Sequence, residues 1–159
     1  FDVPDARWRG FERGTAAAGL DAETITFANG NFSMTGGYEA AAELLDHHPR
    51  PTAVFAMSDE MAFGALMALD ERALTPGIDV SVMGVDDHEF SRVVDLTTIH
   101  QPVADHGSVA ARMLIAAMTG LEGREATDES PSVEHTSSCE PFRPPITVIT
   151  RSTTAPPPD

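Results

Sequence analysis

Short apolar runs alternate along the chain with longer segments in which apolar residues recur every three or four positions. The longer segments, with their caps and terminating Gly or Pro residues, predict helices over 4–18, 34–46, 59–73 and 103–119. The short runs are rich in β-branched residues and predict strands over 24–28, 52–57, 80–85, 97–99 and 146–150. This alternation predicts an α/β fold built from parallel β-α-β units.

Two of the predicted strands stop abruptly at carboxylates. The stretches are TAVFAMSDE (52–60) and VSVMGVDDHE (80–89), and one helix-length segment separates them. Open α/β sheets bind ligands at the carboxyl ends of their strands, where acidic side chains grip hydroxyl groups, amines or metals. The sequence therefore predicts half of a small-molecule pocket at this edge.

The predicted helix over 59–73 carries two apolar stripes. The first consists of Ala62, Leu66, Leu69 and Ala73, and the second of Phe63, Met67 and Leu74. One stripe can pack on the sheet, but a single chain offers few partners for the other. We therefore expect Phe63, Met67 and Leu74 to form the interface of a homodimer.

Composition narrows the possible partners. The 159 residues suit one domain, and 25 acidic against 10 basic residues give a net charge of -15, which disfavours binding to nucleic acid.

The single Cys139 precludes an internal disulfide framework and favours a reducing compartment, so a cytoplasmic location is expected. No signal peptide or membrane-spanning run is visible, and no membrane partner is expected. Because the chain begins at Phe1 instead of Met, we expect it to be a piece of a longer protein.

Six motifs follow one another in the order found in one family of bacterial regulators. They are RWRGF (7–11), GNFSMTGGYEAA (30–42), PTAVFAMSDEMAFGALMAL (51–69), DVSVMGVDDHE (79–89), LTTIHQP (96–102) and TRST (150–153). Each motif alone is a weak signal, but together they span almost the whole chain. The sequence resembles the C-terminal half of the effector-binding domain of LacI/GalR-type transcription regulators.

The resemblance implies a doubly wound parallel sheet of the periplasmic-binding-protein-like type I, mainly its C-terminal lobe. It implies that residues 1–100 form this lobe, that 101–120 cross over and supply a helix to the N-terminal lobe, and that 146–159 return as a strand and tail. Residues 121–145, which are acidic and rich in Pro and Ser, are expected to form a loop. This segment is longer than in the family pattern, and the stretch between Asp87 and Leu96 is shorter.

The resemblance also implies three residues that bind an effector. Arg7 matches an arginine that reaches into the cleft, where a planar guanidinium fits two vicinal hydroxyls or a carboxylate. Phe32 matches an aromatic residue that stacks on the effector ring. Asp86 matches an acid that accepts hydrogen bonds from effector hydroxyls or amines. The alternatives are a surface arginine, a core phenylalanine and a turn-capping aspartate.

Two more positions, Ser58 and Gln101, match effector-binding positions of the family, and each also has a possible structural role. Ser58 stands where relatives often have a ligand-binding Asn, but it is also a good helix N-cap. Gln101 matches a crossover residue that touches the ligand, and its alternative role is hydrogen bonding at a hinge. Asp59 is expected to stabilise the helix start, and Asp87 to point away from the ligand and cap local backbone.

No metal, cofactor or catalytic site is expected. His47 and His48 are expected to form a solvated pair at a helix end, and His88, His100 and His106 lack ligand-like spacing. The Gly-x-Ser-x-Gly nucleophile motif is missing around Ser58, because Ala56 and Glu60 occupy the glycine positions.

These features predict the effector-sensing and dimerisation domain of a cytoplasmic transcription regulator. Its effector would be a small molecule. Arg7, Phe32 and Asp86 suit a sugar, which is the first choice, but nucleobase-sensing members of the family use similar chemistry. DNA would bind only through an N-terminal helix-turn-helix module absent from this chain. The alternative is a solute-binding receptor of a sugar transporter, which shares the two-lobe fold. The TRST ending and the second apolar stripe favour the regulator.

Overall fold

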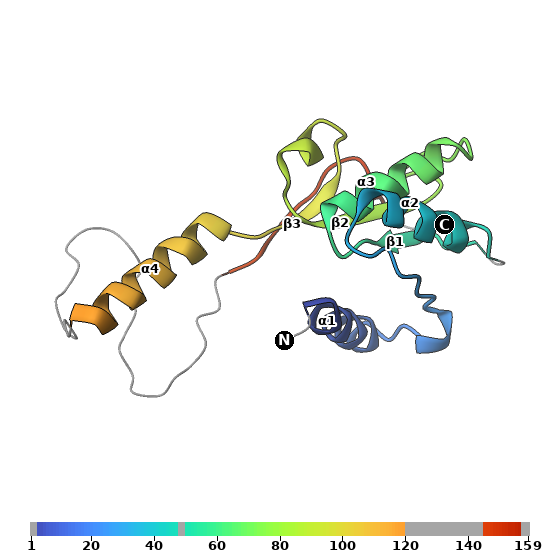
Figure 1. The fold of residues 1–159 in the computed structure, drawn as a ribbon. Coiled ribbons are helices and arrows are strands. Elements are labelled where there is room, and N and C mark those ends of the chain that lie inside the picture. The colour runs from blue at the N-terminus through green and yellow to red at the C-terminus, as the bar shows by residue number, and fades with distance from the viewer. Residues whose placement is uncertain (1–2, 48–49, 120–144, 157–159) are drawn as a thin grey trace. The chain divides into compact units, whose positions relative to one another are not determined.

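A computed structural model describes residues 3–47, 50–119 and 145–156 of the chain (Figure 1). Its centre is a four-stranded sheet in the order β1 (Ala53–Phe55), β2 (Ser81–Asp86), β3 (Thr97–His100) and β4 (Thr147–Ile149). The first three strands are parallel, as the sequence predicted. β4 runs antiparallel to β3, because the chain leaves the sheet at the end of β3 and returns at the same place, with His100 opposite Thr147. The sheet is therefore mixed and not wholly parallel.

The four predicted helices are present. They are α1 (Val3–Ala17), α2 (Met34–Leu45), α3 (Asp59–Asp70) and α4 (Val103–Thr119), with short 3₁₀ turns η1 (Ala22–Thr24) and η2 (Glu89–Arg92). Ser33 caps α2 by accepting a hydrogen bond at 3.0 Å from the Gly36 amide. α3 ends earlier than its apolar pattern predicted, because Ala73 adopts a left-handed conformation with φ of 54°.

The strand predicted over 24–28 does not form in the described part of the chain. Residues 22–24 belong to η1, and 25–28 have no regular structure. Phe27 is 58% exposed and its ring meets the Trp8 ring edge-on at 5.1 Å. A strand requires a hydrogen-bonding neighbour, and alternation in the sequence cannot show whether one exists.

Helices pack on both faces of the sheet. Val54 of β1 packs against the core that α2 and α3 form with the sheet, whereas the next residue, Phe55, stacks on Phe11 of α1 with ring centroids 5.2 Å apart. Successive side chains of a strand point to opposite faces, so α1 and the α2–α3 pair lie on opposite sides. β1 itself is only partly buried, contrary to the buried strand that the sequence predicted.

The first apolar stripe of α3 enters the core, where Ala62 and Leu69 are almost inaccessible. The second stripe differs from the prediction at Phe63. This side chain is 6% exposed and packs edge-on against His88 and Phe90 of its own chain, so a second subunit is not needed to bury it. Met67 is 54% exposed, and Leu74 is partly buried.

The chain divides into two compact units, one formed by 1–101 and 147–159 and the other by 102–146. In the second unit, α4 exposes several large apolar side chains, namely Val103, Met113, Leu114 and Met118. Residues 121–144 of the predicted loop lie outside the described residues. Within the described ranges, no helix is both long and apolar enough to cross a bilayer.

Candidate functional site

The carboxylate of Asp86 is the centre of a polar cluster at the carboxyl end of β2. Its Oδ1 accepts one hydrogen bond at 3.2 Å from Nη2 of Arg7 and another at 2.7 Å from Nε2 of Gln101. Arg7 comes from α1, and Gln101 directly follows β3. Three segments that are distant in sequence therefore meet at the strand edge where open α/β sheets bind ligands.

Arg7 links this carboxylate to an aromatic ring. Its second guanidinium nitrogen, Nη1, donates to the backbone carbonyl of Met57, at the end of the neighbouring strand. Its Cζ lies 5.7 Å from the centre of the Phe32 ring, a cation–π distance. The Phe32 ring is exposed, and its backbone is left-handed with φ of 49°. The guanidinium thus joins an acidic group and an apolar face in one small region.

The environment of Asp86 opposes its ionisation. Burial raises the pKa of its carboxyl group above the usual value. The positive charge of Arg7 lowers this pKa but only partly offsets burial, and the nearby charges of Asp59 and Glu60 raise it further. Its backbone φ of 122° is also unfavourable for a residue with a side chain, and such strain is common at ligand sites. Asp86 is therefore a carboxylate that gains from additional hydrogen-bond donors.

Ser58 does not belong to this cluster. It is 2% exposed, and its Oγ accepts a hydrogen bond at 3.3 Å from the Met61 amide at the start of α3. This geometry is that of a helix N-cap, the alternative role that the sequence allowed. Four of the five predicted effector-binding residues come together, and Ser58 is the exception.

Asp59 is a structural acid, as the sequence predicted. It is fully buried and accepts three hydrogen bonds, from the His88 amide at 2.8 Å, Ser91 Oγ at 2.6 Å and Thr98 Oγ1 at 2.6 Å. A side chain at Gly84 would collide with its Oδ1 atom. Asp59 thus ties the start of α3 to η2 and β3, and it faces away from solvent.

Asp87 points to different partners from Asp86. Its Oδ1 accepts a hydrogen bond at 3.1 Å from Nη2 of Arg151, and its Oδ2 lies 3.0 Å from Nδ1 of His100. Burial alone would raise the pKa of Asp87, but the hydrogen bonds and charges of Arg151 and His100 outweigh it and lower this pKa. The side chain binds these two residues instead of capping backbone, which corrects the prediction. Sequence analysis did not identify this group, although Arg151 lies within the TRST motif.

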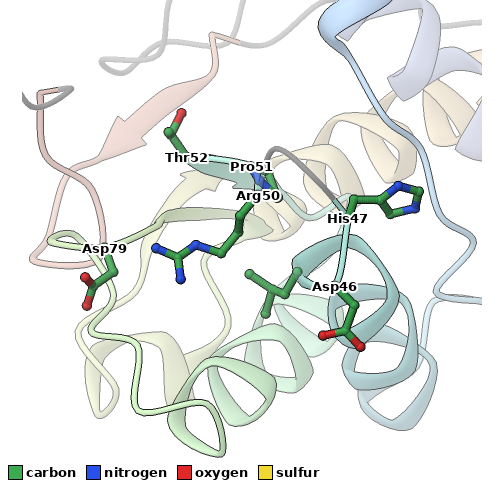
Figure 2. A pocket seen from close by; sticks show the side chains of 7 residues that line it. Asp46, His47, Arg50, Pro51, Thr52 and Asp79 are labelled. Carbon is green, nitrogen blue, oxygen red and sulfur yellow. The ribbon is translucent and has the colours of Figure 1, made fainter.

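A hollow lies at the opposite end of the strands, where the chain enters β1 (Figure 2). It has a volume of about 460 Å³ and is lined by Leu45, Asp46, His47, Arg50, Pro51, Thr52 and Asp79. In Figure 2 the guanidinium of Arg50 points toward the side where Asp79 lies. Asp46 is already paired with Arg72 at 3.2 Å. None of the predicted effector-binding residues lines this hollow.

No group of three His, Cys, Asp or Glu side chains in the described ranges is arranged to hold a metal ion. The predicted cluster at Asp86 remains the best candidate site, because it combines donors, an acceptor and an aromatic face.

Comparison with known proteins identifies the family. The model of the periplasmic binding protein-like domain matches residues 1–154. The chain is 37% identical over 123 residues to the ribose operon repressor of Escherichia coli (strain K12), covering 75% of the chain and 37% of that protein. It is 32% identical over 124 residues to the catabolite control protein A of Priestia megaterium, covering 77% and 36%. The chain therefore spans about a third of the length of these relatives.

Solved structures agree with this match. A LacI family transcriptional regulator from Enterococcus faecium with bound ribose superposes with a TM-score of 0.78 at 29% identity, covering 97% of this chain and 52% of that one. The lac repressor dimer bound to operator gives a TM-score of 0.75 at 25% identity, covering 96% and 48%. The chain belongs to the periplasmic binding protein-like family, and its resemblance to the effector-binding domain of LacI/GalR-type regulators is confirmed.

Proposed function

We propose that this chain senses a small polyhydroxylated metabolite, a sugar, on behalf of a DNA-binding transcription regulator. The observation that carries the proposal is the convergence of Arg7, Phe32, Asp86 and Gln101 at the carboxyl end of β2. These residues supply two kinds of donor, one charged acceptor and one apolar face. That combination suits a molecule whose ring has hydroxyl groups on its edge and C–H groups on its faces.

The existing contacts of Asp86 are compatible with such a ligand. The carboxylate of Asp86 now accepts hydrogen bonds from Arg7 and Gln101. Sugar hydroxyl groups both donate and accept, so they can bond to Asp86 while receiving bonds from Arg7 and Gln101. Because burial raises the pKa of Asp86, added donors would favour its charged form. Phe32, which is exposed, could cover one face of the ring.

The relatives support a sugar. One is named a ribose operon repressor, one solved structure has bound ribose, and another is a transcriptional regulator CelR–cellobiose complex with a TM-score of 0.73. A transport receptor is not favoured, because the similar curated proteins include a ribose operon repressor and a transcriptional repressor PurR. The same relatives support a regulator that acts in the cytoplasm and catalyses no reaction.

We extend the proposal to the layout of the whole protein. Residues 1–100 would form the C-terminal lobe, 101–120 would cross to the N-terminal lobe, 121–145 would form a loop, and 146–159 would return. The division of the chain after Gln101 and before Thr147 supports these boundaries. DNA would bind through a module outside this chain, since a net charge of -15 repels phosphates. Effector binding would change DNA affinity if the effector binds two lobe arrangements unequally.

We also propose that the protein is a homodimer, and that Met67 of α3 and Leu74, which follows this helix, lie in its interface. Met67 is exposed and Leu74 is partly buried. Phe63 would support the interface from within the chain, because it is already covered by Phe90. The similarity to the lac repressor dimer supports this assembly.

The test is a thermal-shift screen of sugars and purines on the full-length protein, followed by calorimetry on Asp86→Ala. Charged hydrogen bonds contribute about 1.5–3 kcal/mol each, so losing Asp86 should weaken effector binding by about tenfold or more. Asp70→Asn, at an exposed position of α3, is the control and should bind like the wild type. If Asp86→Ala leaves affinity unchanged but lowers the melting temperature, Asp86 is only a structural residue. If no sugar stabilises the protein, the proposed effector class is wrong.

A further inference from the structure

Two consecutive carboxylates at the end of β2 serve different partners. Asp86 binds Arg7 and Gln101, whereas Asp87 binds Arg151 and His100. The divergence depends on the backbone, where Asp86 has φ of 122° and Asp87 has φ of 55°. Two adjacent residues with positive φ are costly unless other contacts hold them, so the partners of Asp87 have a structural task.

Asp87 and its partner His100 are each the immediate neighbour in sequence of a residue of the effector site. Asp87 follows Asp86, the last residue of β2, and His100, the last residue of β3, precedes Gln101. The contact between Asp87 and His100 thus runs beside the hydrogen bond between Gln101 and Asp86. Asp86 is bonded to Asp87, and His100 is bonded to Gln101. Fixing the contact between Asp87 and His100 therefore restricts the geometry of the hydrogen bond between Asp86 and Gln101.

Arg151 anchors this arrangement to the last part of the chain. Besides Asp87, its guanidinium donates at 2.6 Å to the carbonyl of Leu96, and its amide donates at 2.9 Å to Oγ1 of Thr97. Its side chain is largely buried. Arg151, which follows β4, therefore joins Asp87 after the end of β2 to Leu96 and Thr97 at the start of β3.

We propose that Asp87 is a positioning residue of the effector site. Asp87 is itself anchored by Arg151, and it holds His100 at the end of β3, and through it Gln101, beside the carboxylate of Asp86. The inference rests on the proposed function, because the site it serves is the proposed effector site. Asp87 itself touches no ligand, so its loss should loosen the site without removing any group that contacts the effector.

The matched control is Asp95. It has the same φ of 55° as Asp87, and its Oδ2 accepts a hydrogen bond at 3.3 Å from the amide of Ser152, next to Arg151. It does not contact the end of β3. Asparagine tolerates a left-handed backbone, so Asp87→Asn and Asp95→Asn remove a charge at equivalent conformations.

The experiment compares these two variants in the full-length protein by two measurements. Amide hydrogen exchange is measured without ligand, and ribose binding is measured by calorimetry. We expect Asp87→Asn to speed exchange over residues 97–101 by about tenfold, with no change over α2 and α3, because only the end of β3 is released. We expect ribose affinity to fall by about tenfold in the same variant. Asp95→Asn should match the wild type in both measurements.

Two results would overturn the inference. One is exchange over 97–101 that is the same in Asp87→Asn and Asp95→Asn. The other is exchange that rises equally over α2 and α3, since this would make Asp87 a general stabiliser. If ribose does not bind the wild type, the proposed effector is corrected, and the exchange measurement still decides the role of Asp87.

Discussion

Replacing the buried Asp59 by alanine should destabilise this domain more than replacing an exposed acidic residue by alanine. The carboxylate is fully buried between α3, η2 and β3. It accepts hydrogen bonds from the amide of His88 and from the hydroxyl groups of Ser91 and Thr98. Alanine would leave all three donors without this acceptor, in a region that water does not reach.

The magnitude follows from these contacts. A buried donor that loses its partner costs about 1–3 kcal/mol, so three donors would cost about 3–9 kcal/mol. Alanine also removes the penalty of burying a charge, which offsets part of this loss. We expect a net decrease of about 3–5 kcal/mol in the free energy of unfolding. Because a typical domain has about 5–15 kcal/mol in total, the variant would be close to unfolding.

The difference in unfolding free energy between the wild type and Asp59→Ala is measured by urea denaturation, with circular dichroism as the signal. Asp59→Asn should also destabilise, because its amide NH₂ would face a donor where the carboxylate had an acceptor. Asp70→Ala is the control, and a surface change of this kind is worth about 0.5 kcal/mol or less. A loss below about 1 kcal/mol for Asp59→Ala would refute the argument that these three hydrogen bonds hold the elements together.

Two further predictions concern the dimer and pH. Met67→Asp should weaken the proposed homodimer, since burying a methionine side chain contributes about 1.5–3 kcal/mol, and analytical ultracentrifugation showing an equally stable dimer would contradict the interface. The pKa of Asp87 is lowered in the folded state, so its ion pair with Arg151 stabilises the fold above the ordinary aspartate pKa and is lost as the pH falls through the lowered value. The difference in unfolding free energy between the wild type and Asp87→Asn should therefore shrink from pH 7 to strongly acidic pH, and a constant difference would show that the ion pair is not responsible.

The sequence by itself predicted the helices and most of the strands. The spacing of apolar residues, the serine caps and the β-branched runs are local signals, and they located α2, α3, β2 and β3 to within a few residues. It also predicted that Arg7, Phe32, Asp86 and Gln101 act together, although only the order of family motifs linked them. The structure brings these four residues into contact.

The tertiary structure decided the features that depend on contacts between residues distant in sequence. The run over 24–28 has strand-like alternation but forms no strand, because pairing requires a partner that a local pattern cannot reveal. The sequence predicted that Phe63 is covered by a second subunit, but Phe90 of η2 packs edge-on against its ring within the same chain. For Ser58 the sequence allowed both ligand binding and a helix N-cap, and in the structure its hydroxyl group caps the start of α3.

Asp86 and Asp87 show most clearly the difference between what the sequence determines and what the tertiary structure determines. The sequence places Asp86 and Asp87 side by side at the end of one strand. The family motif assigned the effector to Asp86, but it did not predict which residues Asp87 contacts. Positive backbone φ angles turn the two carboxylates toward different partners. Asp87 meets Arg151, which is 64 positions away, and this pairing exists only because β4 returns to lie against β3. Local pattern fixes which residues end a strand, but only the folded chain determines which charges they meet.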